Sequence, residues 1–335
     1  MLIEKLNLII FLTLIIINLI IYNNIFYINK FLNIYDLPNK QRKIHKTKIA
    51  KTGGIIIFFN LTLLFISNYL FDNFLEIENP SFFNLLYVGI LFFFLIGLID
   101  DIYDLKPNLK LFLSAIFLII LLFYNENLTI NIIRLSFYKN VIDLDGYSII
   151  FSVLCFLLFI NAINMFDGIN LQTILYSTLL LVVNLILMGD IIFVFYLLPI
   201  IICVAALNYK NKLFLGDNGT LLIGFILSCF FILNYNNLAI FYADSIFIFM
   251  MLPGLEVLRL AVSRILKKRN PFSADRMHIH HLLLKRMSYS STMITNFSLI
   301  LIPILIDYYS DINNLYLICG YIFIYFCGIY RISKY

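Results

Sequence analysis

Residues 82–104 read FFNLLYVGILFFFLIGLIDDIYD, a long apolar run that ends abruptly in acids. A helix needs roughly 20 mostly apolar residues to cross a hydrocarbon core about 30 Å thick, and this run approaches that length. Polar and apolar residues do not alternate in it, as they would in a lipid-facing barrel strand, so a transmembrane helix is predicted. The same pattern, an apolar run closed by polar residues, recurs along the chain.

The composition predicts a protein that crosses the membrane many times. Hydrophobic residues make up 62% of the 335 positions, and the mean hydropathy is +0.95, well above that of soluble domains. The first run lacks a small-residue cleavage site, so it is interpreted as a helix rather than a signal peptide. We expect an all-α integral membrane protein, a single domain over residues 1–335. About eleven transmembrane helices are expected, near 6–28, 53–71, 82–99, 109–124, 148–165, 172–188, 191–207, 220–236, 243–262, 292–308 and 314–330.

Lysine and arginine predict which side of the membrane each loop occupies. With the amino terminus outside, the inner segments carry 20 of the 24 basic residues. Basic residues gather on the cytoplasmic side, so the carboxyl terminus is predicted in the cytoplasm. The net charge of +5 follows from this bias, and no nucleic-acid partner is expected. The inner loops that would carry the chemistry are 29–52, 100–110, 164–171, 208–219 and 263–291.

Acids close the apolar run of residues 82–99. Asp100 and Asp104 are four residues apart and are predicted to share a helical face, with Asp101 beside them. Adjacent carboxylates at the carboxyl end of a helix repel each other and oppose the helix dipole. A divalent cation, or a bound phosphate with its cation, would relieve this repulsion, so a functional role is favoured over a structural one.

Amides and an acid close the run that ends near residue 165. A single amide there would be interpreted as helix packing, but Asn161, Asn164 and Asp167 repeat every three residues. Oxygen ligands in register favour a hard cation such as Mg²⁺, which takes few protein carboxylates. Asp217 sits in a Gly-Asp-Asn-Gly sequence that suits an ordinary turn, but a tight turn would also fix this lone carboxylate.

Histidines mark the last large inner loop, which contains His278, His280 and His281 after Arg276. No cysteine is nearby and the spacing matches no common structural zinc site, so a zinc site is disfavoured. Arginine can bind phosphate oxygens in pairs and histidine can donate a hydrogen bond or a proton, so phosphate recognition is preferred. The first inner loop, with Lys43 and His45, is either an anchor to anionic lipid or a second phosphate-gathering segment.

In this order the motifs resemble those of the polyprenyl-phosphate N-acetylhexosamine-1-phosphate transferases, glycosyltransferase family 4. The resemblance extends over residues 36–284 and is nearest to the branch that uses undecaprenyl phosphate and N-acetylglucosamine. It implies an enzyme of the bacterial inner membrane, with its active site on the cytoplasmic face. Such an enzyme transfers a sugar 1-phosphate from a UDP-sugar to polyprenyl phosphate, releases UMP and starts lipid-linked polysaccharides such as the O-antigen of lipopolysaccharide.

The resemblance also implies roles for individual residues. Mg²⁺ is the expected cofactor, with Mn²⁺ as an alternative, and a homodimer is left open. Lys267, Lys268 and Arg269 would raise the local concentration of the nucleotide sugar. Asp100, Asp101, Asp167 and His281 would be catalytic, the first two as a base or by orienting the lipid phosphate; Asp104, Asn161, Lys43, His45, Arg276, His278 and His280 would bind substrate; Asp217, Asn164 and Asp167 would hold the metal.

The chain departs from the family pattern at a few positions. Lys48 and Ala50 stand where prolines are frequent, Asn170 where a second acid is frequent, and Glu256 where aspartate is usual. These changes bear on the identity of the sugar more than on the chemistry, because four aspartates of the motifs are intact: Asp100, Asp101, Asp167 and Asp217.

Two other functions are alternatives. An integral-membrane prenyltransferase also binds a magnesium diphosphate through acids, but it would not account for the histidine loop or the Gly-Asp turn. A secondary transporter predicts acids near the bilayer midplane and two halves related by a repeat, and the sequence shows neither. The transferase is therefore the preferred hypothesis.

Overall fold

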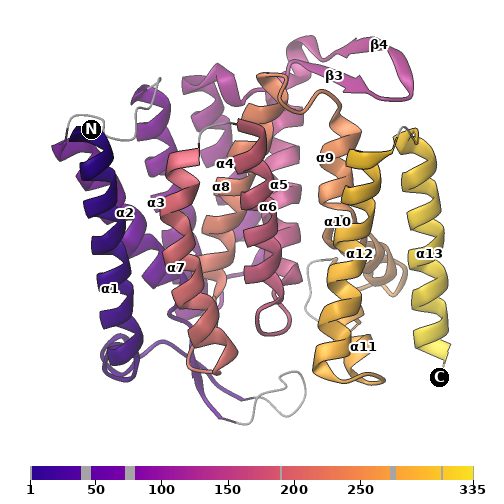
Figure 1. The fold of residues 1–335 in the computed structure, drawn as a ribbon. Coiled ribbons are helices and arrows are strands. Elements are labelled where there is room, and N and C mark those ends of the chain that lie inside the picture. Colours follow the sequence, from indigo (N-terminus) through magenta and orange to yellow (C-terminus); the bar gives the residue numbers. More distant parts are fainter. Residues whose placement is uncertain are drawn as a thin grey trace. The chain divides into compact units, whose positions relative to one another are not determined.

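The computed structural model describes residues 2–38, 47–71, 80–188, 191–271, 277–310 and 312–334. Nearly all of its regular structure is helical, so the predicted all-α class is confirmed (Figure 1). The chain divides into two compact units, and each is described by itself. The first unit comprises Met1–Lys106 and Thr173–Cys229, and the second comprises Pro107–Gln172 and Phe230–Tyr335.

The first unit is built from long apolar helices and one very small sheet. α1 packs along α7, and α2 contacts both α3 and α7 (Figure 1). Strand β1 pairs antiparallel with β2, and Ala50 of β2 also forms a bridge with Leu213. The elements are α1 (Leu2–Leu32), β1 (Tyr35–Asp36), β2 (Ile49–Ala50), α2 (Gly53–Leu70), α3 (Pro80–Tyr103), α6 (Gln172–Met188) without Gln172, α7 (Ile191–Tyr209) and the first part of α8 (Asp217–Asn236).

Aromatic rings and two polar contacts hold this unit together. Phe58 of α2 stacks on Phe94 of α3 with ring centroids 4.0 Å apart. At the end of α1, Asn29 donates from Nδ2 to the carbonyl oxygen of Lys212 at 2.9 Å and accepts from the hydroxyl of Thr52 at 2.7 Å. Burying these polar groups is tolerable because each has a partner. The end of α1 is therefore fixed to the segment that precedes α2.

The second unit combines helices with a hairpin. Strands β3 and β4 pair antiparallel, and Arg134 of β3 anchors them by donating to the carbonyl oxygens of Phe241 and Tyr235, both at 2.9 Å. α5 contacts α4 and α10, and α12 contacts α9, α11 and α13. The elements are α4 (Pro107–Tyr124), η1 (Glu126–Leu128), β3 (Ile132–Leu135), β4 (Tyr138–Asp143), η2 (Asp145–Tyr147), α5 (Ser148–Phe166), the end of α8, α9 (Ala243–Phe249), α10 (Met251–Leu266), α11 (Ile279–Leu284), α12 (Tyr289–Tyr309) and α13 (Asn314–Lys334).

Eight helices in the described part of the chain are long and apolar enough to cross a membrane: α1, α2, α3, α4, α5, α8, α12 and α13. The pair α9–α10 would make a ninth span if it crosses as one broken helix, while the described portions of α6 and α7 are shorter apolar helices. The fold is therefore that of a multi-pass membrane protein. The count of eleven spans stays a prediction.

The predicted span at 243–262 is broken in the structure. α9 ends at Phe249, α10 begins at Met251, and the two axes are bent by 80°. Pro253 supplies a reason, because proline has no N–H to continue a helix and its ring crowds the preceding turn. Proline is tolerated in the first turn of a helix, which is where Pro253 stands in α10.

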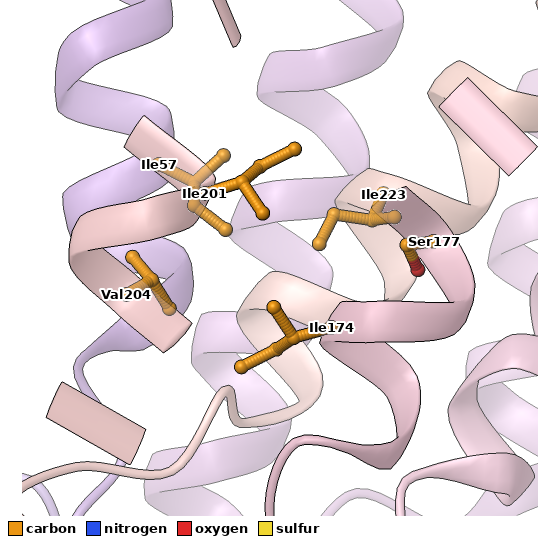
Figure 2. Close-up of a pocket in the computed structure, with 6 residues that line it drawn as sticks. All are labelled: Ile57, Ile174, Ser177, Ile201, Val204 and Ile223. Carbon is orange, nitrogen blue, oxygen red and sulfur yellow. The ribbon is translucent and has the colours of Figure 1, made fainter. Parts of the chain in front are cut away.

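A small apolar pocket lies within the first unit among α2, α6, α7 and α8 (Figure 2). Ser177 contributes a polar atom, and its hydroxyl has no hydrogen-bond partner among the described residues. Such a lining suits hydrocarbon rather than phosphate, so the polar chemistry must be sought elsewhere. The lining residues are Ile57, Ile174, Ser177, Ile201, Val204 and Ile223.

Candidate active site

The carboxylate of Asp101 is the centre of a polar cluster in the first unit. Its side chain is only 1% exposed. Oδ1 lies 3.1 Å from Nζ of Lys51. Oδ2 accepts from the backbone N–H of Asn218 at 2.9 Å and from its side-chain amide at 2.5 Å. Both carboxylate oxygens are thus engaged, which suits a residue that orients its neighbours better than one that takes up a proton.

Lys51 faces more negative charge than it can neutralise. Its Nζ also lies 4.0 Å from Oδ1 of Asp36. Burial lowers the pKa of Lys51, but the carboxylates of Asp101, Asp36 and Asp217 outweigh burial, so its pKa is raised and it is charged at neutral pH. Three carboxylates around one ammonium leave a surplus of negative charge, and a divalent cation would reduce it.

The turn that carries Asp217 is held by close backbone contacts. The N–H groups of Gly53 and Gly54 donate to the carbonyls of Phe214 and Leu215, both at 3.0 Å. A Cβ on Gly54 would collide with the backbone of Gly219. The glycine pair therefore lets the start of α2 approach the backbone of residues 214–219 closely.

Asp217 begins α8 and follows Gly216, whose φ of +75° favours glycine. Asn218 reaches back from this helix start and donates to the carbonyl of Lys51 at 3.0 Å. Gly97 of α3 packs against the same turn, where a Cβ would meet the carbonyl oxygen of Asp217. The predicted turn is the first turn of α8, which begins at Asp217 itself rather than near residue 220, and it lies beside the acids that end α3.

The other two acids of α3 differ from Asp101. Oδ1 of Asp100 accepts from the N–H of Leu105 at 2.8 Å, and its side chain is partly exposed. Asp104 follows the last helical residue, is exposed and has a φ of 55°. The helix ends at Tyr103, one residue before Asp104. The predicted helical face therefore contains Asp100 but not Asp104.

In the second unit, the end of α5 meets the histidine loop. α5 ends at Phe166, and the exposed Asp167 follows it. Gly168 packs against the ring of His280, where a Cβ would fall on the ring itself. A glycine is required here because only a bare backbone lets the two segments approach so closely. The predicted Asp167 and histidine clusters are thus neighbours.

Gln172 links these segments. Its side-chain N–H₂ donates to the carbonyl of Phe166 at 2.8 Å and lies 3.3 Å from Nδ1 of His280, while its carbonyl oxygen accepts from Asn296 at 3.1 Å. An amide N–H₂ can only donate, so with this amide orientation Nδ1 of His280 accepts and its proton lies on Nε2. Burial, followed by the nearby His281 and His278, lowers the pKa of His280 well below its ordinary value.

The three histidines lie together. The ring centroids of His278 and His281 are 5.3 Å and 4.4 Å from that of His280. His280 is buried, whereas His278 and His281 are half-buried. His278 and His281 are therefore the histidines that a ligand can reach.

Other predicted site residues have simpler surroundings. The amide of Asn161 donates to the carbonyl of Leu157 at 2.7 Å, one turn earlier in α5. Asn164 is half-buried on the same helix. The predicted basic residues after α10 are exposed, as expected for groups that would gather an anion. Lys43, His45 and Arg276 lie outside the described residues, so their predicted roles stay predictions.

The carboxylates around Lys51 are the candidates for a metal site in the first unit. Within the described ranges, no three His, Cys, Asp or Glu side chains gather closely enough to hold a metal by themselves. Mg²⁺ often takes one or two protein carboxylates and completes its shell with water and substrate phosphate. The surplus of carboxylates around Lys51 fits such a partial shell, with Asp217 as the acid that starts a helix.

The structure therefore joins the predicted clusters in two pairs. Asp100 and Asp101 meet the Asp217 turn in the first unit, and Asp167 meets the histidines in the second. The roles of Lys51, Asn218 and Gln172 could not be predicted from the sequence, because each acts through a partner at least 50 positions away.

Comparison with known proteins bears on this arrangement. Residues 83–235 match the family model described as glycosyl transferase family 4. The matched segment contains Asp100, Asp101, Asp167 and Asp217, while the histidine loop lies beyond it. The predicted family resemblance is confirmed.

Relatives of this family match the chain over most of its length. An undecaprenyl-phosphate alpha-N-acetylglucosaminyl 1-phosphate transferase from Thermotoga maritima is 29% identical over 258 residues, 76% of this chain and 74% of the relative. A protein of the same name from Salmonella typhi is 25% identical over 268 residues, 76% and 70% of the two chains. A phospho-N-acetylmuramoyl-pentapeptide-transferase from Campylobacter jejuni is 26% identical over 241 residues, 61% and 66%.

Proposed function

We propose that the chain transfers N-acetylglucosamine 1-phosphate, or a closely similar N-acetylhexosamine 1-phosphate, from a UDP-sugar to polyprenyl phosphate. UMP is the second product, and the lipid-linked sugar starts a cell-envelope polysaccharide. The observation that carries the proposal is the pairing of motifs, Asp101 with the Asp217 turn and Asp167 with the histidines. The relatives named N-acetylglucosaminyl 1-phosphate transferases support the choice of sugar.

The proposal includes a topology. Eleven spans would place the amino terminus outside and the carboxyl terminus in the cytoplasm of a bacterium, with the active site on the cytoplasmic face of the inner membrane. Each expected range contains a helix, or a broken pair of helices, and the bias of basic residues supports the orientation.

The reaction is a phosphoryl transfer. An oxygen of the lipid phosphate attacks the β-phosphorus of the UDP-sugar, and a new P–O bond forms. The bond from that phosphorus to the oxygen shared with the α-phosphate breaks, and UMP leaves with the electron pair. Because bonding changes only at phosphorus, positioning and neutralisation of charge account for most of the catalysis.

Asp100 would orient the lipid phosphate. A phosphate monoester has a second pKa near ~6 and is already mostly dianionic at neutral pH, so a strong base is unnecessary. The engaged oxygens of Asp101 favour orientation over proton transfer for that residue. On the donor side, His278 and His281 would bind the diphosphate or the sugar, with His281 nearest to the chemistry.

Mg²⁺, when bound, would neutralise the charge of the diphosphate. Asp217 is the first residue proposed to hold it, and Asn164 and Asp167 keep the ligand roles predicted from the sequence. Mn²⁺ has similar oxygen preferences and would substitute. Lys51 and Asn218 would keep the Asp217 turn in place.

The test is turnover by the purified protein with undecaprenyl phosphate, Mg²⁺ and a panel of UDP-sugars, followed as UMP release. UDP-N-acetylglucosamine is expected to support turnover, and Asp217→Asn is expected to abolish it without loss of thermal stability. Turnover only with a UDP-muramoyl-pentapeptide would move the protein to the other branch of the family. No UMP from any UDP-sugar would refute the proposal.

A further inference from the structure

A buried carboxylate in α10 holds the segment that leads into the histidines. Glu256 is 3% exposed. Its Oε2 accepts from the backbone N–H of Ile279 at 2.9 Å and lies 3.7 Å from Nδ1 of His278. Ile279 is the first residue of α11, so its N–H is one of the donors that a helix start leaves without an intrahelical partner. Glu256 therefore caps the short helix that carries His280 and His281.

Two further side chains complete this anchor. Oε1 of Glu256 accepts from NH2 of Arg259 at 2.9 Å and also from the hydroxyl of Tyr325 in α13. NH2 of Arg259 donates to the carbonyl of Met277 at 2.6 Å. Nε of Arg259 is 2.8 Å from the Tyr325 hydroxyl. Hydrogen bonds from Arg259 and to Glu256 thus hold the backbone immediately before and immediately after His278.

The buried group of Glu256, Arg259 and Tyr325 would destabilise the fold if one of its members were missing. A buried carboxylate is strongly destabilising when it is unpaired, and here Arg259 supplies the opposite charge. Each member also satisfies polar groups of the other two, so the loss of one leaves the others short of partners. Arg259 and Glu256 bind the carbonyl of Met277 and the N–H of Ile279, the two backbone groups that flank His278. Fold stability alone would not require contacts at these two positions.

We propose that Glu256, Arg259 and Tyr325 form a positioning group that fixes the histidine loop for the nucleotide sugar. This inference rests on the proposed function, in which His278 and His281 bind the donor. None of the three touches substrate in the proposal, and they act through the backbone of residues 277–279. The group also gives a role to α13, which lies beyond the residues that match the family model.

The first measurement is hydrogen exchange, which needs no substrate. Glu256→Gln keeps the size of the side chain but removes its charge, and Tyr325→Phe removes one hydroxyl. In both variants the amides of residues 279–281 should exchange about tenfold faster or more, as expected when a charge-assisted hydrogen bond is lost. Unchanged exchange in both would overturn the anchor.

Tyr321→Phe is the matched control. Tyr321 lies one turn before Tyr325 in α13 and is also buried, but its hydroxyl has no hydrogen-bond partner among the described residues. Its loss should leave exchange at residues 279–281 unchanged. Equal acceleration by Tyr321→Phe would show general loosening of α13 and would overturn the specific role of Tyr325.

The second measurement separates the two substrates. In Glu256→Gln, the KM for the UDP-sugar should rise by about tenfold while the KM for polyprenyl phosphate changes less than about twofold, because the lost contacts lie on the donor loop. Glu256→Asp keeps the carboxylate and should restore part of the loss. An equal rise in both KM values would overturn the positioning role.

The two measurements distinguish the anchor from the proposed function. A wild-type chain that releases no UMP would refute the transferase and with it the donor-binding purpose of the loop. Hydrogen exchange would still decide whether Glu256 holds the loop.

Discussion

At the scale of single residues, the ion pair between Lys51 and Asp101 determines how the acids of α3 can act. Asp101 is almost fully buried, and its two oxygens already bind Lys51 and Asn218. Asp100 is half-buried, and its Oδ1 accepts from the N–H of Leu105. Two adjacent aspartates in one motif therefore have different surroundings.

Replacing Lys51 should expose this difference. Lys51→Met leaves the Asp101 carboxylate buried without its cation, and we expect a loss of about 1–3 kcal/mol in the free energy of unfolding, less than for a fully buried pair because Lys51 is partly exposed. Turnover should fall with it, since the Asp217 turn loses its support. Lys51→Arg, which keeps the charge, should retain most of the stability and activity; if Lys51→Met matched the wild type in thermal unfolding and UMP release, the ion pair would be unimportant.

His280 should make stability depend on pH. Its pKa in the folded protein lies below the ordinary value of 6.5, so below that pH the unfolded chain binds a proton that the folded chain does not. The stability due to neutral His280 is present above pH 6.5 and is lost as pH falls toward the folded-state pKa. Thermal unfolding between about pH 7 and pH 5 should therefore show a steeper decline for the wild type than for His280→Gln. Equal slopes would contradict the assignment.

At the scale of elements, the bilayer made most of the helices predictable. A span must satisfy its own backbone groups in hydrocarbon, so an apolar run of sufficient length has few alternatives to a helix. The break between α9 and α10 was missed, because one proline hardly changes the average hydropathy of a run. Partners of Lys51, Gln172 and Glu256 were also missed, since contacts between distant parts of the chain leave no trace in local composition.

The crossing of α2 and the start of α8 gives a prediction at this scale. Gly54→Ala places a methyl group against the backbone of Gly219, which cannot move as a flexible side chain could. We expect a loss of about 1–3 kcal/mol in stability, as for other overpacked sites, and reduced turnover. Gly320→Ala is the control, because a Cβ there meets nothing within 4 Å, and it should raise stability by up to about 1 kcal/mol, since alanine is the better helix former. Similar effects of both substitutions would argue against the close crossing.

At the scale of the whole molecule, the family resemblance and the membrane character could be predicted from the order of the motifs and from the apolar runs. Orientation rests on charge alone and can be measured. Lys139, at the β3–β4 hairpin, is proposed to lie outside, and Lys268, after α10, inside. In a cysteine-free background, Lys139→Cys should react with an impermeant maleimide in intact cells, whereas Lys268→Cys should react only after permeabilisation. The opposite pattern would invert the topology.

The length of α1 has a further consequence. Its apolar stretch, Leu6–Leu32, has 27 residues and is about 40 Å long at ~1.5 Å per residue, longer than a hydrocarbon core of about 30 Å. A helix with such hydrophobic mismatch tilts or thickens the surrounding lipid. Asn29 ties the end of α1 to Thr52, the neighbour of Lys51, so a change in tilt would pull on the Lys51–Asp101 pair.

The rate of turnover should therefore depend on the acyl-chain length of the surrounding lipids. Turnover in vesicles of short-chain and long-chain lipids should differ at equal substrate density, and Asn29→Ala should flatten that difference by uncoupling α1 from Thr52. A wild-type rate that does not vary with bilayer thickness would show that α1 absorbs the mismatch alone. A rate that does vary with thickness in the wild type, and less so in Asn29→Ala, would show that the bilayer regulates the proposed transfer through α1.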